Sequence, residues 1–276
     1  MIKKENTAAV VVAYNIEKNK LLENIKTYSK FVDKIIVVDN SDRDNNLKDI
    51  QDSKISYIKL KGNEGIAKGL NVGIKYAIEN EYLYVLTMDQ DSSFSNNLIN
   101  EYSKNEKQDV IIYSPNYFID RKKKKKYKKN IKYMYWTMTS GNLLNLQLYK
   151  KNGTFKEELF IDAVDYEYCL RARKNGYKIL QCNKAILKHN PGITKIKKFL
   201  FYKYKYGYMS PTRLYYQVRN LRYLMINYNC YRALLIIIIK LMKILFLFDN
   251  KKNYLKMFKK AILDSKKGIY GKIAEE

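Results

Sequence analysis

Cysteine, proline and histidine are scarce in this sequence of 276 residues, which contains 3 Cys, 3 Pro and 1 His. Cys169, Cys182 and Cys230 are widely separated, which excludes a disulfide framework and a regularly spaced cysteine metal site. No apolar stretch reaches the roughly 20 residues of a conventional membrane-spanning helix. The apolar run at residues 8–14 is followed by no small-residue cleavage site. We therefore expect a cytoplasmic protein without a secretion signal.

Acidic residues are also few, because 27 Asp and Glu stand against 53 Lys and Arg and leave a net charge of +26. Such a charge predicts attraction to nucleic acid, anionic lipid headgroups or phosphorylated substrates. The basic residues gather in one loop and in the C-terminal part, and no nucleic-acid-binding motif is present, so nucleic acid is not the expected partner. A non-enzymatic nucleic-acid-binding protein remains a remote alternative. The apolar content of 46% excludes a disordered chain.

Short apolar runs alternate with helical patterns in the first ninety residues. Strands are predicted at 8–14, 34–40, 55–60 and 82–89, and helices at 17–30 and 66–79. This alternation predicts a right-handed parallel βαβ sheet, in which ligands bind beyond the carboxyl ends of the strands. Asp39 and Asp89 both follow a strand, so we expect the functional site at that edge.

The remaining sequence is less regular. Its patterns predict a hairpin from 109–118 and 131–140 with a basic tip, a helix at 163–175 closed by Gly176, and a strand at 177–189. Tyr- and Lys-rich helices are predicted over 197–230, followed by an apolar run at 233–248 and a basic tail.

The strongest local motif is Asp89-Gln90-Asp91, directly after a predicted buried strand. Two carboxylates one residue apart can together reach a divalent ion and a diphosphate. A turn with two solvated acids is the alternative.

Further motifs surround this one in a fixed order. VVDNSD, GNEGIAKGLNVGI, LTMDQDSSF, FIDAVDYEYCLRARKNGYKI and LKHNPG together resemble family 2 glycosyltransferases of the GT-A fold, over about residues 8–192. SPTRLYYQVRN (210–220) matches more weakly, and the DQDS form is most similar to bacterial rhamnosyltransferases of surface polysaccharide synthesis. The resemblance implies an α/β, Rossmann-like nucleotide-diphosphosugar transferase fold with a mainly parallel central sheet. It implies a catalytic domain at 1–195, with a nucleotide-binding half at about 1–95 and an acceptor-side half at 96–195, and a helical extension at 196–276.

The resemblance also assigns the donor site residue by residue. The residues that it places beside the nucleotide sugar are Ala13, Tyr14, Asn15, Asp39, Asn63, Gly65, Lys68, Asn71, Asp89, Gln90 and Arg219, with Arg213 as an alternative to Arg219. For Gly65 and for Gly73, tight turning or close helix packing is the other interpretation. The residues that it implies for a bound Mn²⁺ or Mg²⁺ are Asp91, Asp89 and His189, although His189 could instead be structural.

On the acceptor side, Asp165 matches the catalytic base of the family. Val164 stands where the family usually has Glu, which weakens any role for an acid at that position. Asp165 could instead be a helix N-cap, and Asp162 is the rival base. Trp136, Ser140 and Gly141 resemble the acceptor-side wall, with a Trp buried in the core as the alternative. Glu167 and Arg171 form an ordinary helix pair by their spacing.

The resemblance implies an inverting, metal-assisted sugar transfer, with dTDP-rhamnose as the favoured donor and a UDP-hexose or UDP-galactofuranose as the alternative. The acceptor implied is a polyprenyl-diphosphate-linked oligosaccharide of capsule, O-antigen or cell-wall synthesis, at the inner face of the bacterial plasma membrane. The apolar run 233–248, with Lys240 and Lys243 near its middle, and the Tyr- and Lys-rich segment 201–208 favour peripheral attachment to an anionic membrane surface. Burial of 233–248 against the catalytic domain is the alternative.

Overall fold

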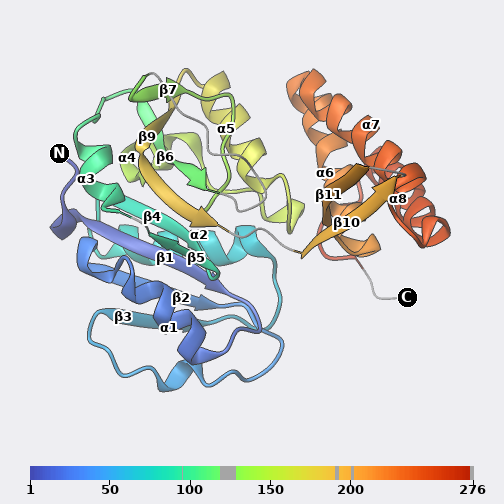
Figure 1. The fold of residues 1–276 in the computed structure, drawn as a ribbon. Coiled ribbons are helices and arrows are strands. Elements are labelled where there is room, and N and C mark those ends of the chain that lie inside the picture. The colour runs from blue at the N-terminus through green and yellow to red at the C-terminus, as the bar shows by residue number, and fades with distance from the viewer. Residues whose placement is uncertain (95, 119–128, 190–192, 200–201, 274–276) are drawn as a thin grey trace.

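A computed structural model describes residues 1–94, 96–118, 129–189, 193–199 and 202–273 of the chain. Figure 1 shows a large sheet flanked by helices on one side of the molecule and a helical unit with a short hairpin on the other. Short 3-10 turns lie at Lys4–Asn6, Ser29–Phe31, Leu47–Asp49 and Glu157–Leu159.

The N-terminal half of the sheet is parallel, as the alternation predicts. Its strands are β1 (Thr7–Ala13), β2 (Lys34–Asp39), β3 (Ile55–Lys59) and β4 (Tyr84–Asp89), in the order β3-β2-β1-β4. The whole of β1 is buried, because helix α1 (Lys18–Lys26) and helix α2 (Ile66–Glu79) belong to the layers on its two sides. A Cβ at Gly73 would lie 2.5 Å from a Val10 methyl, so this glycine serves close helix packing.

The second half of the sheet is mixed and differs from the predicted hairpin. Strand β6 (Val110–Phe118) pairs in parallel with β9 (Lys178–His189), and β7 (Ile131–Tyr133) pairs antiparallel with the same β9. The segments at 109–118 and 131–140 therefore do not pair with each other in the described residues, and most of the basic run between them lies outside those residues. Strands β8 (Asn142–Asn145) and β5 (Ser92–Phe94), which were not predicted, complete the nine-stranded sheet that the described residues form.

Three helices accompany this half: α3 (Leu98–Ser103), α4 (Leu146–Asn152) and α5 (Val164–Lys174). Helix α5 confirms the predicted helix at 163–175. Gly176 follows it at a φ of +83°, a conformation that glycine adopts without the steric cost of a Cβ.

The predicted helical region at 197–230 is only partly helical. Strands β10 (Ile193–Phe199) and β11 (Tyr202–Tyr208) pair antiparallel before helix α6 (Pro211–Tyr228) begins. Tyr and Lys alternate along β11 with the two-residue period of a strand. This period explains why the segment is a strand, although its Tyr- and Lys-rich composition led to the prediction of a helix. Helices α7 (Tyr231–Phe246) and α8 (Lys251–Lys266) follow and pack with α6.

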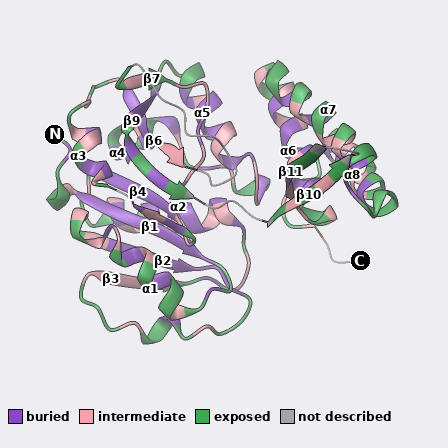
Figure 2. Cartoon of the chain, viewed as in Figure 1, coloured by how far each residue is buried: buried purple, intermediate pink, exposed green. Residues whose placement is uncertain are grey.

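Buried residues form a layer on each side of the sheet and a third cluster among α6, α7 and α8 (Figure 2). The third cluster also includes Phe160 and Ala163, which belong to the loop before α5. The C-terminal helices are thus packed onto the loop that carries Asp162. Among the described residues, none of the helices combines the length and the hydropathy needed to cross a bilayer.

Candidate active site

The carboxyl ends of β1, β2 and β4 bring the predicted strand-end acids to one edge of the sheet. In the parallel register, Ala13 lies opposite Asp39 on one side, and Val12 lies opposite Asp89 on the other. Asp39 and Asp89 therefore flank the end of β1, as the sequence predicts. Ala13 itself is fully buried, so of the segment 13–15 only Tyr14 and Asn15 expose their side chains.

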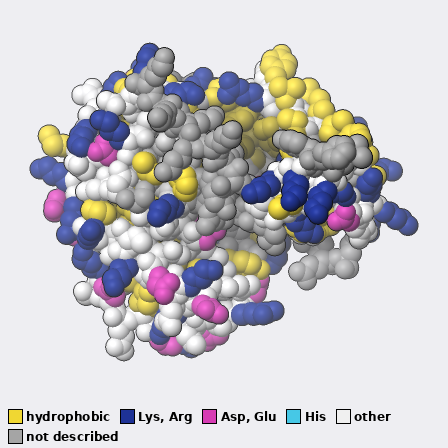
Figure 3. Space-filling view, in the orientation of Figure 1, with side chains coloured by type: hydrophobic (Ala, Val, Ile, Leu, Met, Phe, Trp, Pro, Cys, Tyr) yellow, Lys and Arg dark blue, Asp and Glu magenta, His cyan; other side chains and the backbone are white. Residues whose placement is uncertain are grey.

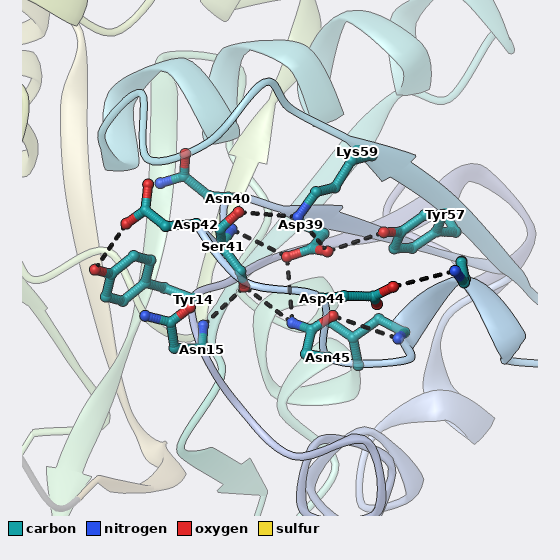
Figure 4. A network of polar contacts seen from close by, with 12 residues as sticks. Tyr14, Asn15, Asp39, Asn40, Ser41, Asp42, Asp44, Asn45, Tyr57 and Lys59 are labelled. Atoms are coloured by element: carbon teal, nitrogen blue, oxygen red, sulfur yellow. Dashed lines mark hydrogen bonds and ion pairs between the residues drawn. The ribbon is translucent and has the colours of Figure 1, made fainter.

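Asp39 is the centre of a buried polar network (Figure 4). Its carboxylate accepts hydrogen bonds from the Ser41 amide (3.0 Å), the Tyr57 hydroxyl (2.9 Å) and the Lys59 ammonium (3.0 Å). Burial alone would raise its pKa, but these donors outweigh burial and hold the pKa of Asp39 below its usual value. Asp39 is therefore ionised at neutral pH and orients the loop after β2. Its contact with a nucleotide base stays a prediction.

A side-chain clamp connects the ends of β1 and β4. Gln90 accepts a hydrogen bond from the Tyr14 amide at 2.6 Å and donates one to the Tyr14 carbonyl at 3.2 Å. The Tyr14 hydroxyl donates to Asp42 at 3.2 Å, while the Tyr14 side chain is 41% exposed. Tyr14 thus presents an ordered aromatic ring at the open edge of the sheet, where a flat base could stack.

The turn before α2 requires its glycine. Gly65 has a φ of +90°, and a Cβ there would lie 2.6 Å from the Phe160 carbonyl oxygen. The Asn63 side chain accepts from the Gly65 amide at 3.2 Å, and the Ile66 amide donates to the Phe160 carbonyl at 2.8 Å. This turn therefore holds the loop before α5 against the start of helix α2.

Asn71 does not belong to the donor site, contrary to the prediction. Its amide nitrogen donates to the Phe155 carbonyl and Glu157, and its oxygen accepts from the Tyr149 hydroxyl and the Phe155 amide, all within 2.8–3.0 Å. Asn71 is also buried, so both polar atoms are used inside the protein. Lys68, one turn earlier, forms an ion pair with Glu157 at 3.2 Å, and its contact with a donor stays a prediction.

The charges of four acids act on one region beyond the sheet: Asp89 and Asp162 act on Asp165, and Asp89, Asp91 and Asp162 act on Arg213. Burial, together with the negative charges of Asp162 and Asp89, raises the pKa of Asp165 to about 7. The N-cap of α5 is Ala163, so the alternative that Asp165 is an N-cap is wrong. The Asp165 carboxylate accepts a hydrogen bond from the adjacent Tyr166 amide at 2.9 Å. Its carboxylate is thus poised to exchange a proton near neutral pH.

Asp162 is in a different state. The Arg213 guanidinium pairs with its carboxylate at 3.1 Å, and the Gln217 amide donates to it at 3.1 Å. Phe160, Asp162 and Ala163 all have a positive φ near 60°. The backbone of residues other than glycine rarely adopts this conformation, so the surrounding contacts must hold the loop in it. The Arg213 guanidinium and the Gln217 amide occupy the Asp162 carboxylate, and this arrangement favours Asp165 over its rival as the base.

Arg213 replaces Arg219 as the cation of the site. The negative charges of Asp162, Asp89 and Asp91 raise the pKa of Arg213, and 53% of its side chain is exposed. Arg219 is 1% exposed and donates to the carbonyls of Gly271 (2.8 Å) and Leu159 (3.3 Å), so the prediction for Arg219 is wrong. Gln217 was missed, although its spacing of four residues from Arg213 places both on one face of α6.

Arg219 is expected to be a stability residue. Arg219→Met should lower the free energy of unfolding by about 2–4 kcal/mol, because two buried carbonyls lose charged donors. Urea unfolding measures this, and Arg213→Met on the same helix is the matched control with a smaller expected effect. Weaker donor binding without lost stability would contradict the structural assignment.

The predicted acceptor wall divides into two parts. The Trp136 ring stacks on the Tyr166 ring, with centroids 4.6 Å apart, directly beside Asp165. Trp136 is half-buried, so its role toward a sugar stays a prediction. Ser140 and Gly141 are fully buried, and the Asp89 amide donates to the Ser140 hydroxyl at 3.1 Å. These two residues therefore position the end of β4 rather than line an acceptor surface.

The metal assignment rests on Asp89 and Asp91. His189 lies opposite Ser92 in the pairing of β5 with β9, but its side chain is outside the described residues. Within the described part of the chain, three or more His, Cys, Asp or Glu side chains do not gather into a group that could hold a metal ion. Metal ligation by all three residues stays a prediction.

The sequence model of a family described as glycosyl transferase family 2 matches residues 8–161 of the chain. Along 96% of both chains, the sequence is 32% identical to a protein of Shigella flexneri named dTDP-rhamnosyl transferase RfbF. A segment covering 30% of this chain is 34% identical to the uncharacterized protein MJ0544 of Methanocaldococcus jannaschii and covers 39% of it.

Two solved structures share the fold at low sequence identity. One is GalNAc-T7 with UDP, GalNAc and Mn²⁺, with a TM-score of 0.54, 13% identity and 67% of this chain covered. The other is S. aureus TarS, with a TM-score of 0.52, 19% identity and 82% of this chain covered. The match spans 43% and 40% of those two chains, respectively. Both likenesses concern the fold alone.

Proposed function

This chain belongs to glycosyl transferase family 2, and we propose that it moves L-rhamnose from dTDP-rhamnose onto a sugar hydroxyl with inversion at the anomeric carbon. The similarity to dTDP-rhamnosyl transferase RfbF along almost the whole chain supports the donor. A UDP-hexose or UDP-galactofuranose is the alternative donor within the same fold.

The observation that carries the mechanism is the buried Asp165 carboxylate, with a pKa raised to about 7, beside the strand-end acid Asp89. Asp165 accepts the proton of the acceptor hydroxyl as that oxygen forms a bond to the anomeric carbon. The bond from the anomeric carbon to the diphosphate oxygen breaks on the opposite face, and the nucleotide diphosphate leaves with the bonding electrons. A single displacement of this kind inverts the configuration.

Asp89 and Asp91 are the residues that would hold Mn²⁺ or Mg²⁺, because carboxylate oxygens are the hard ligands that these ions prefer. When bound, the ion neutralises charge that develops on the leaving diphosphate. Arg213 supplies a permanent positive charge next to the same acids, and its guanidinium can donate two hydrogen bonds to a phosphate.

Around this centre, the exposed Tyr14 ring is the surface for the base and the Trp136–Tyr166 stack is the surface for the acceptor sugar. We extend the proposal to a polyprenyl-diphosphate-linked oligosaccharide acceptor at the inner face of a bacterial plasma membrane, in capsule, O-antigen or cell-wall polysaccharide synthesis. The strong positive charge of the chain is compatible with an anionic surface.

A donor screen tests the function. With Mn²⁺ or Mg²⁺ present, dTDP-rhamnose at about 100 times its Kd should add about 2.7 kcal/mol of stability and raise Tm by several degrees. The matched ligands are dTDP alone, UDP-glucose and UDP-galactofuranose. A shift with a UDP-sugar and none with dTDP-rhamnose would replace the donor. Tight, salt-sensitive binding of an oligonucleotide without any sugar-nucleotide shift would instead overturn the enzyme function.

A further inference from the structure

One face of helix α7 is apolar and exposed along its whole length. The side chains on this face are between 39% and 80% exposed: Tyr231, Leu234, Leu235, Ile238, Ile239, Met242, Leu245 and Phe246. Their spacing of three and four residues places them on one stripe, about 24 Å long for 16 residues. In Figure 3 this stripe is a continuous hydrophobic band over α7. Single exposed apolar residues are ordinary, but a continuous stripe marks an interaction surface.

The opposite face of α7 is already occupied. Ala233, Ile237 and Ile244 are buried in the cluster that α7 forms with α6 and α8. Lys240 also points inward, where it donates to the Gln217 side chain. Burial lowers the pKa of Lys240 to about 8, with the charges of Lys243 and Arg213 acting in the same direction. Lys240 is expected from the sequence to favour an anionic membrane surface, but here it lies on the inward face, and the outward stripe carries no charge.

Basic side chains surround the stripe instead of interrupting it. Residues 193–273 contain 19 Lys and Arg against 2 acids. The exposed lysines of this part that belong to the hairpin or to α8 include Lys198, Lys203, Lys205, Lys251, Lys252 and Lys259. Lys and Arg side chains lie beside the hydrophobic band on the face that Figure 3 shows. An apolar stripe with basic flanks is complementary to a bilayer with anionic headgroups.

We propose that the outward stripe of α7 inserts into the interface of an anionic bilayer, with the helix axis in the membrane plane and the lysines of α8 and of β10–β11 over the headgroups. A second copy of this chain fits the stripe less well, because it would bring another strongly basic unit into contact with the first. The inference deepens the proposed function, and it rests on that function only for placing a lipid-linked acceptor at the same surface. Vesicle binding tests it without sugar transfer.

The full chain should float with vesicles of phosphatidylglycerol and phosphatidylcholine, bind phosphatidylcholine vesicles more weakly, and be partly released by salt. Ile239→Gln with Phe246→Gln should weaken vesicle binding by at least about tenfold, since both side chains enter the apolar layer. Leu83→Gln with Ile186→Gln changes two exposed apolar residues of the sheet domain and is the matched control, with binding unchanged. Lys252→Gln with Lys259→Gln should reduce affinity for anionic vesicles by about fivefold for each lysine.

Several outcomes would overturn the proposal. One is no flotation of the full chain with either vesicle, and another is equal loss of binding in the stripe variant and its control. A third is a wild-type dimer that the stripe variant converts to a monomer in sedimentation without vesicles, because the stripe would then be an interface between copies. Transfer to a soluble acceptor should be unchanged in the stripe variant, which separates failure of this inference from failure of the proposed reaction.

Discussion

Asp165→Asn is expected to reduce the rate of sugar transfer by about 100-fold or more while the donor still binds. The amide has the same shape as the carboxyl group, but it cannot accept the acceptor proton. Single-turnover transfer measures the rate, and calorimetry measures donor affinity. Asp162→Asn is the matched control, because Asp162 is paired with Arg213 and its loss should cost less. An inactive Asp162 variant beside an active Asp165 variant would show that the base is misassigned.

Asp165→Asn is expected to lower activity but to raise the stability of the folded chain at high pH. The pKa of Asp165 is about 7 in the folded chain against an ordinary value of 3.8, so the folded state binds more protons than the unfolded state between these two values. The free energy of unfolding therefore falls as pH rises through this window. Asp165→Asn removes the cost of ionising a buried carboxyl group, and its Tm should exceed that of the parent chain at pH 8 more than at pH 4. A lower Tm at pH 8 would contradict the raised pKa.

Asp91→Asn is expected to weaken metal-dependent donor binding by about 100-fold or more, because one of two carboxylates at the end of β4 loses its charge. Donor affinity measured by calorimetry without metal should change little. Asp44→Asn provides the control, since Asp44 is an exposed carboxylate that pairs with Lys48 away from the four acids. Donor affinity in Mn²⁺ or Mg²⁺ that is the same in both variants would remove Asp91 from the metal site.

The parallel half of the fold could be predicted because its strands are buried on both faces. Such strands are continuous β-branched runs, and turn residues bound them clearly. Strands β5 and β8 have only three and four residues, which is too short for any hydrophobic period. The basic and aromatic composition of residues 197–208 predicts part of a helical region, while the two-residue alternation along β11 indicates a strand. The partner of β11 is β10, and the structure shows their antiparallel pairing, which the composition of the segment does not indicate.

The candidate site was predictable where a motif places an acid at a strand or helix end. Asp89, Asp91 and Asp165 belong to such ends, and the fold brings them to one edge. Arg219 and Asn71 were misplaced because a motif match gives the residue type and not the direction of its side chain. Arg213 and Arg219 lie six positions apart on α6, and a helix makes about one and two-thirds turns over that distance, so the two side chains are about 120° apart around the axis and point to different sides.

The side-chain amide nitrogen of Asn220 lies 2.8 Å from each of the carbonyl oxygens of Leu159, Ile161 and Asp162, so its two N–H groups are shared among three acceptors. It lies 58 positions after Asp162, and a ribosome adding roughly 5–20 residues per second needs several seconds to reach it. During that time a nascent chain contains every candidate carboxylate but not the helix that holds the loop of Asp162. Completion of the site is thus tied to the synthesis of α6, and a chain released before α6 should carry Asp162 in an unsupported loop.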